Sequence, residues 1–289
     1  MEMSMSGDVN RVTQDWNRFG GGIRVSRRDL MILGSGAVGL GLTTALRAEA
    51  AAPEPTYPNV VTETITFQGH KGPLKAFLAR PKTGTGQRPG VVLIHEIRGI
   101  NAHFRDLAKR LASEGMIALV PILASAQPSL TQEGSDEVRD YLQKLSVADM
   151  TSDYEAALAY LKALPDCSGS LGVIGFYWGG TMAENLAMQP SPPVKAAVLY
   201  YSRPINADDV HKLNAALLFQ YAEQDPRTQP QIDNIERRLI GYSKVYEEYI
   251  YEGGKPNFAN ESLPKWYNRD QAALAWSRTV TFLKRQLGG

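Results

Sequence analysis

Residues 172–180, GVIGFYWGG, place Tyr177 between two glycines, Gly175 and Gly179. A buried strand, a sharp glycine-flanked turn and a following helix form the arrangement that presents a catalytic nucleophile at the end of a sheet. The N–H of the next residue, Trp178, would then lie at a helix N-terminus and could stabilise an oxyanion. Such turns carry a serine or cysteine as the nucleophile, whereas this chain carries a phenol.

A second group of chemically active residues lies in the stretch LIHEIRGIN. Glu96 and Arg98 directly follow an apolar run of strand length, His95 is beside them, and His103 is in the first turn of the next helix. A charged group near a buried strand end is costly unless it is paired. Either Glu96 and Arg98 neutralise each other, or they belong to a pocket. His103 either contributes to that pocket or only to the start of the helix.

An acid follows a later strand, in FQYAEQDPRTQP. In this turn Asp225 is either a candidate catalytic acid or a residue whose side chain hydrogen-bonds the backbone of the turn. In enzymes with this kind of turn, the nucleophile works with an acid and a histidine, and the three follow in that order along the chain. The histidine should therefore lie in YIYEGGKPNFANE, after the last strand. That loop has none. The four histidines of the chain are His70, His95, His103 and His211.

The elements that must position these residues alternate between strands and helices. Residues 61–81 have the alternating pattern of an antiparallel hairpin, and residues 90–96 are typical of a strand buried on both faces. Helical spacing predicts helices over 101–115, 147–165 and 270–287. The pattern predicts one domain with a mostly parallel sheet and helices on both faces. In such sheets ligands bind beyond the carboxyl ends of the strands, where all these motifs fall.

The motifs HEIRG, GFYWGG, YYSR, YAEQD and YEGGKPNFANE, in this order, resemble those of the dienelactone hydrolase family over roughly residues 60–287. The resemblance implies an α/β-hydrolase fold. It assigns the catalytic acid to Asp225 and the glutamate that pairs with the resting thiol to Glu96. It also implies a substrate-binding set consisting of Arg98, His103, Arg203 and Trp178.

The chain departs from the family pattern at two positions. The catalytic cysteine falls on Tyr177 and the histidine falls on Pro256. Proline has no titratable group, and a phenol of ordinary pKa about 10 is only about one part in a thousand ionised at neutral pH. Glu96 is the remaining candidate base. The usual Cys-His-Asp hydrolysis of esters or lactones is therefore expected to be lost.

Three functions stay open at this point, so whether the protein is an enzyme is not decided. It could bind a small carbonyl or carboxylate compound beside Arg98 and Arg203, or act as a non-hydrolytic catalyst with Tyr177 as proton donor. It could be an active hydrolase of small esters or lactones that uses Tyr177 and Glu96. It could also be a structural or partner-binding protein with a vestigial pocket. The shape of the pocket distinguishes these cases.

The N-terminal residues have the order of an export signal. Arg27 and Arg28 precede a glycine-rich apolar run, and Ala48–Ala50 (AEA) offers small residues for cleavage. This order resembles a twin-arginine signal, and the run is too short and glycine-rich for a comfortable membrane span. We expect residues 1–50 to be a signal peptide, residues 51–289 to form the domain, and the protein to be periplasmic or exported.

Composition limits the partners. With 43% hydrophobic residues, 21% charged residues and a net charge of +1, nothing indicates nucleic-acid binding or adhesion to a membrane. The single cysteine, Cys167, excludes an intrachain disulfide. Metal-ligand spacing, a phosphate loop and a dinucleotide motif are all missing, so no metal and no cofactor are expected. The expected partner is a small molecule, and the oligomeric state is left open.

Overall fold

A computed structural model of the chain describes residues 23–24, 56–83, 86–130, 132–190 and 194–288. The predicted signal peptide lies outside the described residues, apart from the two-residue strand β1. The described residues form a single nine-stranded sheet in the order β1-β9-β8-β7-β6-β4-β5-β3-β2, in which β1 comes from the predicted signal peptide and the other strands from the predicted domain. The strands are β1 (Ile23–Arg24), β2 (Val60–Gln68), β3 (Pro73–Pro81), β4 (Arg88–Ile94), β5 (Ile117–Ile122), β6 (Cys167–Phe176), β7 (Ala196–Tyr200), β8 (Ala216–Ala222) and β9 (Tyr246–Tyr251).

Most neighbouring strands are parallel, as the sequence predicts. β2 and β3 form the expected antiparallel hairpin, in which Gln68 pairs with Pro73, and β3 pairs antiparallel with β5. All pairs from β5 through β4, β6, β7 and β8 to β9 are parallel. Their carboxyl ends therefore lie along one edge, where the candidate site residues follow.

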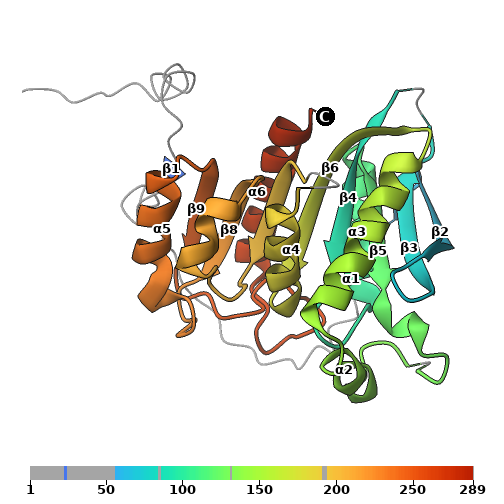
Figure 1. Ribbon diagram of the computed structural model, residues 1–289, viewed down its shortest axis with the longest axis horizontal. Coiled ribbons are helices and arrows are strands. Elements are labelled where there is room, and N and C mark those ends of the chain that lie inside the picture. Colours follow the sequence, from blue (N-terminus) through green and yellow to red (C-terminus); the bar gives the residue numbers. More distant parts are fainter. Residues whose placement is uncertain (1–22, 25–55, 84–85, 131, 191–193, 289) are drawn as a thin grey trace, which may run out of the picture.

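Helices cover both faces of the sheet (Figure 1). The α-helices are α1 (Ala102–Ser113), α2 (Asp136–Leu142), α3 (Val147–Ala163), α4 (Trp178–Met188), α5 (Ile232–Gly241) and α6 (Arg269–Leu287). Three short 3-10 helices, η3 (Leu123–Ala126), η4 (Ala207–Lys212) and η5 (Gln229–Gln231), follow β5, β7 and β8. Figure 1 shows α3, α4 and α5 in front of the sheet and α6 behind it.

The central strand β4 divides the apolar core into two layers. Val92 and Ile94 pack in the cluster that includes residues of α3, α4 and α5. Val91 and Leu93 pack in the cluster on the opposite face, with residues of α1 and α6. All four side chains are fully buried, which explains why the strand is a continuous apolar run rather than an alternating one.

One buried carboxyl outside the candidate site makes stability depend on pH. Glu184 of α4 is buried, and burial followed by the charge of Asp209 raises its pKa to about 8. The pKa of Glu184 is higher in the folded than in the unfolded chain, so the folded protein keeps this proton up to a higher pH. The contribution of the protonated Glu184 to the free energy of unfolding is full below about pH 4.5 and is lost as pH rises towards 8.

We therefore expect Glu184→Gln to stabilise the protein at alkaline pH, because the amide stays neutral where the buried carboxylate does not. Unfolding in urea should give nearly equal free energies for the two proteins at pH 4.5, and a clear advantage for the variant at pH 8.5. An advantage that is the same at both pH values would contradict the assignment to Glu184.

Candidate active site

The turn between β6 and α4 holds Tyr177 in a strained backbone conformation, with φ 53° and ψ −109°. Its N–H donates to the Tyr200 carbonyl oxygen at 3.0 Å. A Cβ on Gly175 would lie 2.1 Å from the Gly179 carbonyl oxygen, and one on Gly179 would lie 2.5 Å from the carbonyl oxygen of Ile94. The predicted strand, turn and helix are thus present, and both glycines are required by packing. Non-glycine residues in this backbone region are uncommon and concentrate at functional sites.

Asp225 follows β8 and is paired with a residue that the sequence analysis did not single out. Its carboxylate is fully buried and accepts from Arg227 through Nε at 2.8 Å and Nη2 at 2.5 Å. The guanidinium carbon of Arg227 lies 4.2 Å from the centre of the Tyr177 ring. Burial opposes the charge of Arg227, but its hydrogen bonds to Asp225 raise its pKa overall. The acid thus neutralises a permanent cation that covers the phenol ring.

Glu96 lies beyond the end of β4 in a largely enclosed position. Asn260 Nδ2 donates to its Oε1 at 3.1 Å. Burial raises the pKa of Glu96 to about 7, while the bond from Asn260 and the charge of Arg98 act in the opposite direction. A carboxyl with such a pKa exchanges protons near neutral pH, as a general base must.

His95 is neutral and fully buried. Its Nδ1 is 2.8 Å from the carbonyl oxygen of Glu96, so Nδ1 carries the proton and Nε2 keeps a lone pair. Burial lowers its pKa to about 4. Nε2 has no hydrogen-bond partner among the described residues, and the ring stacks on Trp178 at 6.3 Å between centres.

A cavity of about 320 Å³ opens beside the residues that follow β4. Its wall includes Lys75, His95, Arg98, Ile100, Ser125 and Glu133. Arg98 is half exposed at this cavity and pairs with Asp136 at 2.5 Å. Lys75 and Arg98 bring two cations to the cavity, although Arg98 shares its charge with Asp136, and Glu133 is paired with Arg105.

The other predicted substrate-binding residues lie outside this cavity. His103 is buried in α1, with its ring edge-on to Phe104 and Phe176, and its Nδ1 lies 3.5 Å from Oε1 of Glu261. Arg203 is exposed in the loop after β7. The structure therefore brings Arg98 to the cavity but not His103, Arg203 or Trp178. The predicted catalytic residues Glu96, Tyr177 and Asp225 do not line it either.

Pro256 lies half-buried in the loop after β9, as predicted. A backbone bond of 2.8 Å from the Gln224 N–H to the Gly254 carbonyl oxygen ties this loop to the turn that carries Asp225. The loop thus passes close to the acid with a proline at the position expected for the histidine.

Three site residues were missed by sequence reasoning. Arg227 is two residues from Asp225, and a cation that close to a candidate acid could have been noticed. Asn260 is 164 positions from Glu96, so nothing local indicates the contact. Tyr201 has φ 36°, and its buried hydroxyl has no hydrogen-bond partner among the described residues. Burial, and then the charge of Glu96, raise the pKa of Tyr201 well above its ordinary value.

Within the described ranges, no three histidine, cysteine, aspartate or glutamate side chains are grouped as metal ligands. We also find no helix in that part of the chain that is long and apolar enough to cross a membrane.

A mostly parallel sheet, a strained turn between β6 and α4, and an aspartate after β8 define a protein of the α/β-hydrolase fold. The model of the Dienelactone hydrolase family matches residues 74–287, and the chain belongs to this family. The predicted fold class and the resemblance are both confirmed.

Solved structures agree on the fold. A Klebsiella pneumoniae structure named as a dienelactone hydrolase superposes with a TM-score of 0.70 at 24% identity, covering 78% of this chain and 99% of that one. Dienelactone hydrolase from Anabaena variabilis gives a TM-score of 0.59 at 20% identity, covering 79% and 99%.

Curated relatives span the same part of the chain. A Synechocystis protein named as a carboxymethylenebutenolidase is 29% identical over 249 residues, covering 79% of this chain and 98% of its own. A Bradyrhizobium protein named as a 2-oxo-3-(5-oxofuran-2-ylidene)propanoate lactonase is 28% identical over 248 residues, covering 80% and 98%. These names make hydrolysis the reaction class of the relatives.

Proposed function

We propose that this protein is an exported member of the dienelactone hydrolase family that has lost hydrolysis by a nucleophile, histidine and acid. It instead binds a small carbonyl or carboxylate compound. The observation that carries the proposal is the pairing of Asp225 with Arg227 above the ring of Tyr177. A triad needs a base that removes the proton of the nucleophile and is oriented by the acid. Arginine stays protonated and cannot be that base.

The phenol is also a poor substitute for a thiol. It extends further from the turn, into the space that an acyl group would need, and an aryl ester formed on it would require an activated water for release. With Pro256 in the loop after β9, the chain offers no imidazole there. The inherited covalent cycle therefore has neither its nucleophile nor its base.

The cavity supports the binding part of the proposal. It is large enough for a small organic molecule, and two cations, Lys75 and Arg98, are part of its wall. The cations suit a carboxylate. The Bradyrhizobium relative is named for a lactone that also carries a carboxylate, which agrees with this ligand class.

An active hydrolase is the second candidate, and the pKa of Glu96 favours it. A carboxyl with a pKa of about 7 can accept a proton from water at neutral pH. Glu96 would then activate the water while the Tyr177 hydroxyl polarises the carbonyl group. This mechanism needs no covalent intermediate.

Export is proposed from the sequence alone. Paired arginines before an apolar run, followed by small residues, are typical of twin-arginine signals, which carry folded proteins. The domain would then fold in the cytoplasm and act in the periplasm.

The binding proposal is tested with levulinate, which has one ketone and one carboxylate, and with its neutral amide. The probe is NMR of histidine-labelled protein, in which His95 is one of only four histidines. We expect levulinate to shift the His95 signals, and Arg98→Met or Lys75→Met to weaken its binding by about tenfold or more.

Arg237→Met, which removes an exposed arginine of α5, is the matched control and should leave the affinity unchanged. Equal binding of the amide, or full affinity in both cavity variants, would refute the proposed ligand class.

A further inference from the structure

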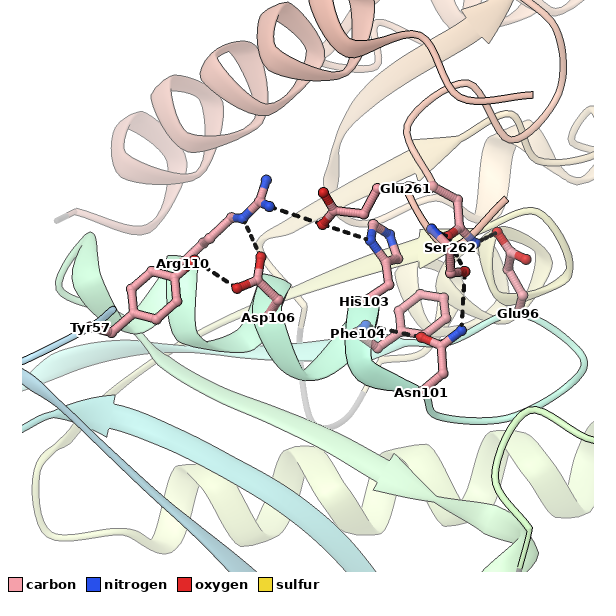
Figure 2. Close-up of polar contacts among 10 residues, drawn as sticks. Tyr57, Glu96, Asn101, His103, Phe104, Asp106, Arg110, Glu261 and Ser262 are labelled. Atoms are coloured by element: carbon pink, nitrogen blue, oxygen red, sulfur yellow. Dashed lines mark hydrogen bonds and ion pairs between the residues drawn. The ribbon is translucent and has the colours of Figure 1, made fainter. Parts of the chain in front are cut away.

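We propose that Asn260 is a positioning residue for Glu96, held by Ser262 and Asn101 so that its amide N–H₂ must point at the carboxyl. Figure 2 shows Glu96, Asn101 and Ser262 side by side, where the loop after β9 meets the beginning of α1 and the end of β4. The proposal does not depend on which ligand the cavity binds or on whether hydrolysis persists.

The orientation of the Asn260 amide follows from its neighbours. Its Oδ1 accepts from the backbone N–H of Ser262 at 3.0 Å and from the Ser262 hydroxyl at 2.6 Å. The backbone N–H can only donate, so a flipped amide would place its N–H₂ against this donor. Nδ2 therefore faces Glu96 Oε1, at 3.1 Å. The side chain is 1% exposed, so water does not compete for these bonds.

Ser262 is in turn tied to the start of α1. Asn101 Nδ2 lies 3.4 Å from the Ser262 hydroxyl, and Asn101 Oδ1 accepts from the Phe104 N–H as the N-cap of the helix. The cap fixes the rotamer of Asn101. Asn101 then holds the hydroxyl of Ser262 in place, and this hydroxyl in turn holds the side-chain oxygen of Asn260. A chain of hydrogen bonds in a buried site restricts each member more than a single bond would.

A second connection holds the same loop from the other side. Glu261 contacts His103 at 3.5 Å and Arg110 at 3.0 Å, and Asp106 accepts from Arg110 and from the hydroxyl of Tyr57. His103 and Arg110 together lower the pKa of Glu261, so this carboxyl is ionised and its negative charge interacts with these two residues of α1. His103 thus faces this loop through Glu261 and does not line the cavity.

The hydrogen bond from Asn260 lowers the pKa of Glu96. Burial disfavours the charged form of Glu96. The groups that favour the charged form are Asn260 and Arg98, and Arg98 is shared with Asp136 and half exposed. A hydrogen bond donated to a carboxylate lowers its pKa, so losing the bond from Asn260 raises it.

Asn260 therefore keeps Glu96 able to change its protonation state near neutral pH. In the protonated state Glu96 can donate a hydrogen bond to a ligand carbonyl, and in the ionised state it can only accept one. The loop that has lost the family histidine would thus still control a proton in the site.

The test is an NMR titration of Glu96 in protein labelled with [5-¹³C]glutamate, assigned with Glu96→Gln. We expect a midpoint near pH 7 in the wild type. Asn260→Asp keeps the acceptors for Ser262 but places a second carboxylate against Glu96, so the midpoint should rise by at least about one unit. Ser262→Ala removes the shorter of the two hydrogen bonds that hold Oδ1, so it should raise the midpoint by a smaller amount.

Asn59→Ala changes an exposed asparagine whose side chain has no partner among the described residues, and it should leave the midpoint in place. Thermal unfolding of every variant identifies those that fail to fold. A merely structural role for Asn260 would lower stability without moving the midpoint. An unchanged midpoint in folded Asn260→Asp and Ser262→Ala overturns the proposal.

Discussion

Replacing Arg227 with methionine is expected to lower the free energy of unfolding by about 3–5 kcal/mol, the usual cost of removing one partner of a buried ion pair. The reason is the position of Asp225, which is fully buried and receives three hydrogen bonds from Arg227, one of them from its backbone N–H. Methionine has a similar reach but no donor, so the carboxylate would be left without a counter-charge. Urea unfolding at pH 7 measures the difference.

Two further variants separate this effect from a general loss of packing. Arg237→Met makes the same change at an exposed site of α5 and should stay within about 0.5 kcal/mol of the wild type. Asp225→Asn combined with Arg227→Met has no buried charge and should recover at least about half of the lost stability. If the double variant is as unstable as Arg227→Met, the ion pair is not what holds this turn.

Most of the fold follows from patterns within short stretches of the chain. The run around Val91 and Val92 is apolar without alternation because both faces of β4 are covered, and this identifies a central strand. Helix α5 was not predicted, although Ile232, Ile235 and Leu239 are buried at helical spacing. The helix follows a turn with two prolines, and it also has an exposed isoleucine, Ile240, which obscures the pattern.

The site could be predicted only in part, because only some of its residues lie next to a strand that the sequence indicates. Glu96, Tyr177 and Asp225 each lie within three residues of the end of a strand, so the parallel topology alone places them along one edge of the sheet. Asn260 and Tyr201 carry no local signal. Asn260 contacts Glu96 across 164 positions. Tyr201 is one of many tyrosines in the chain, and the burial of its hydroxyl without a partner among the described residues, which Tyr154 shares, is a property of the fold.

Packing also explains why Gly175 and Gly179 flank Tyr177. A methyl group at Gly175 or Gly179 would collide with backbone atoms that cannot move away. These glycines would be kept by packing whether or not Tyr177 performs any reaction. Their presence is therefore no argument for catalysis, whereas the identities of Tyr177, Arg227 and Pro256 bear on it directly.

The double variant Tyr177→Cys with Pro256→His is expected to hydrolyse p-nitrophenyl acetate at least about 100-fold faster than the wild type. Cysteine would return a nucleophile to the strained turn, and the Trp178 N–H begins α4 as an oxyanion donor. The loop carrying residue 256 is already bonded to the turn of Asp225. A carboxylate has lone pairs beyond those used by Arg227, so Asp225 can still orient an imidazole.

Tyr177→Cys alone should gain much less, because the thiol would lack its base. Pro256→His alone should gain nothing, since a phenol would still occupy the turn. A silent but folded double variant would mean that more than these two residues separates the site from hydrolysis.

The most direct test of the central claim is the rate of the wild-type protein in the same assay, with a dienelactone as second substrate and Tyr177→Phe beside it. We predict that the wild type is no faster than buffer and that Tyr177→Phe behaves identically. Turnover by the wild type that disappears in Tyr177→Phe would contradict the account and establish a working hydrolase built on the phenol.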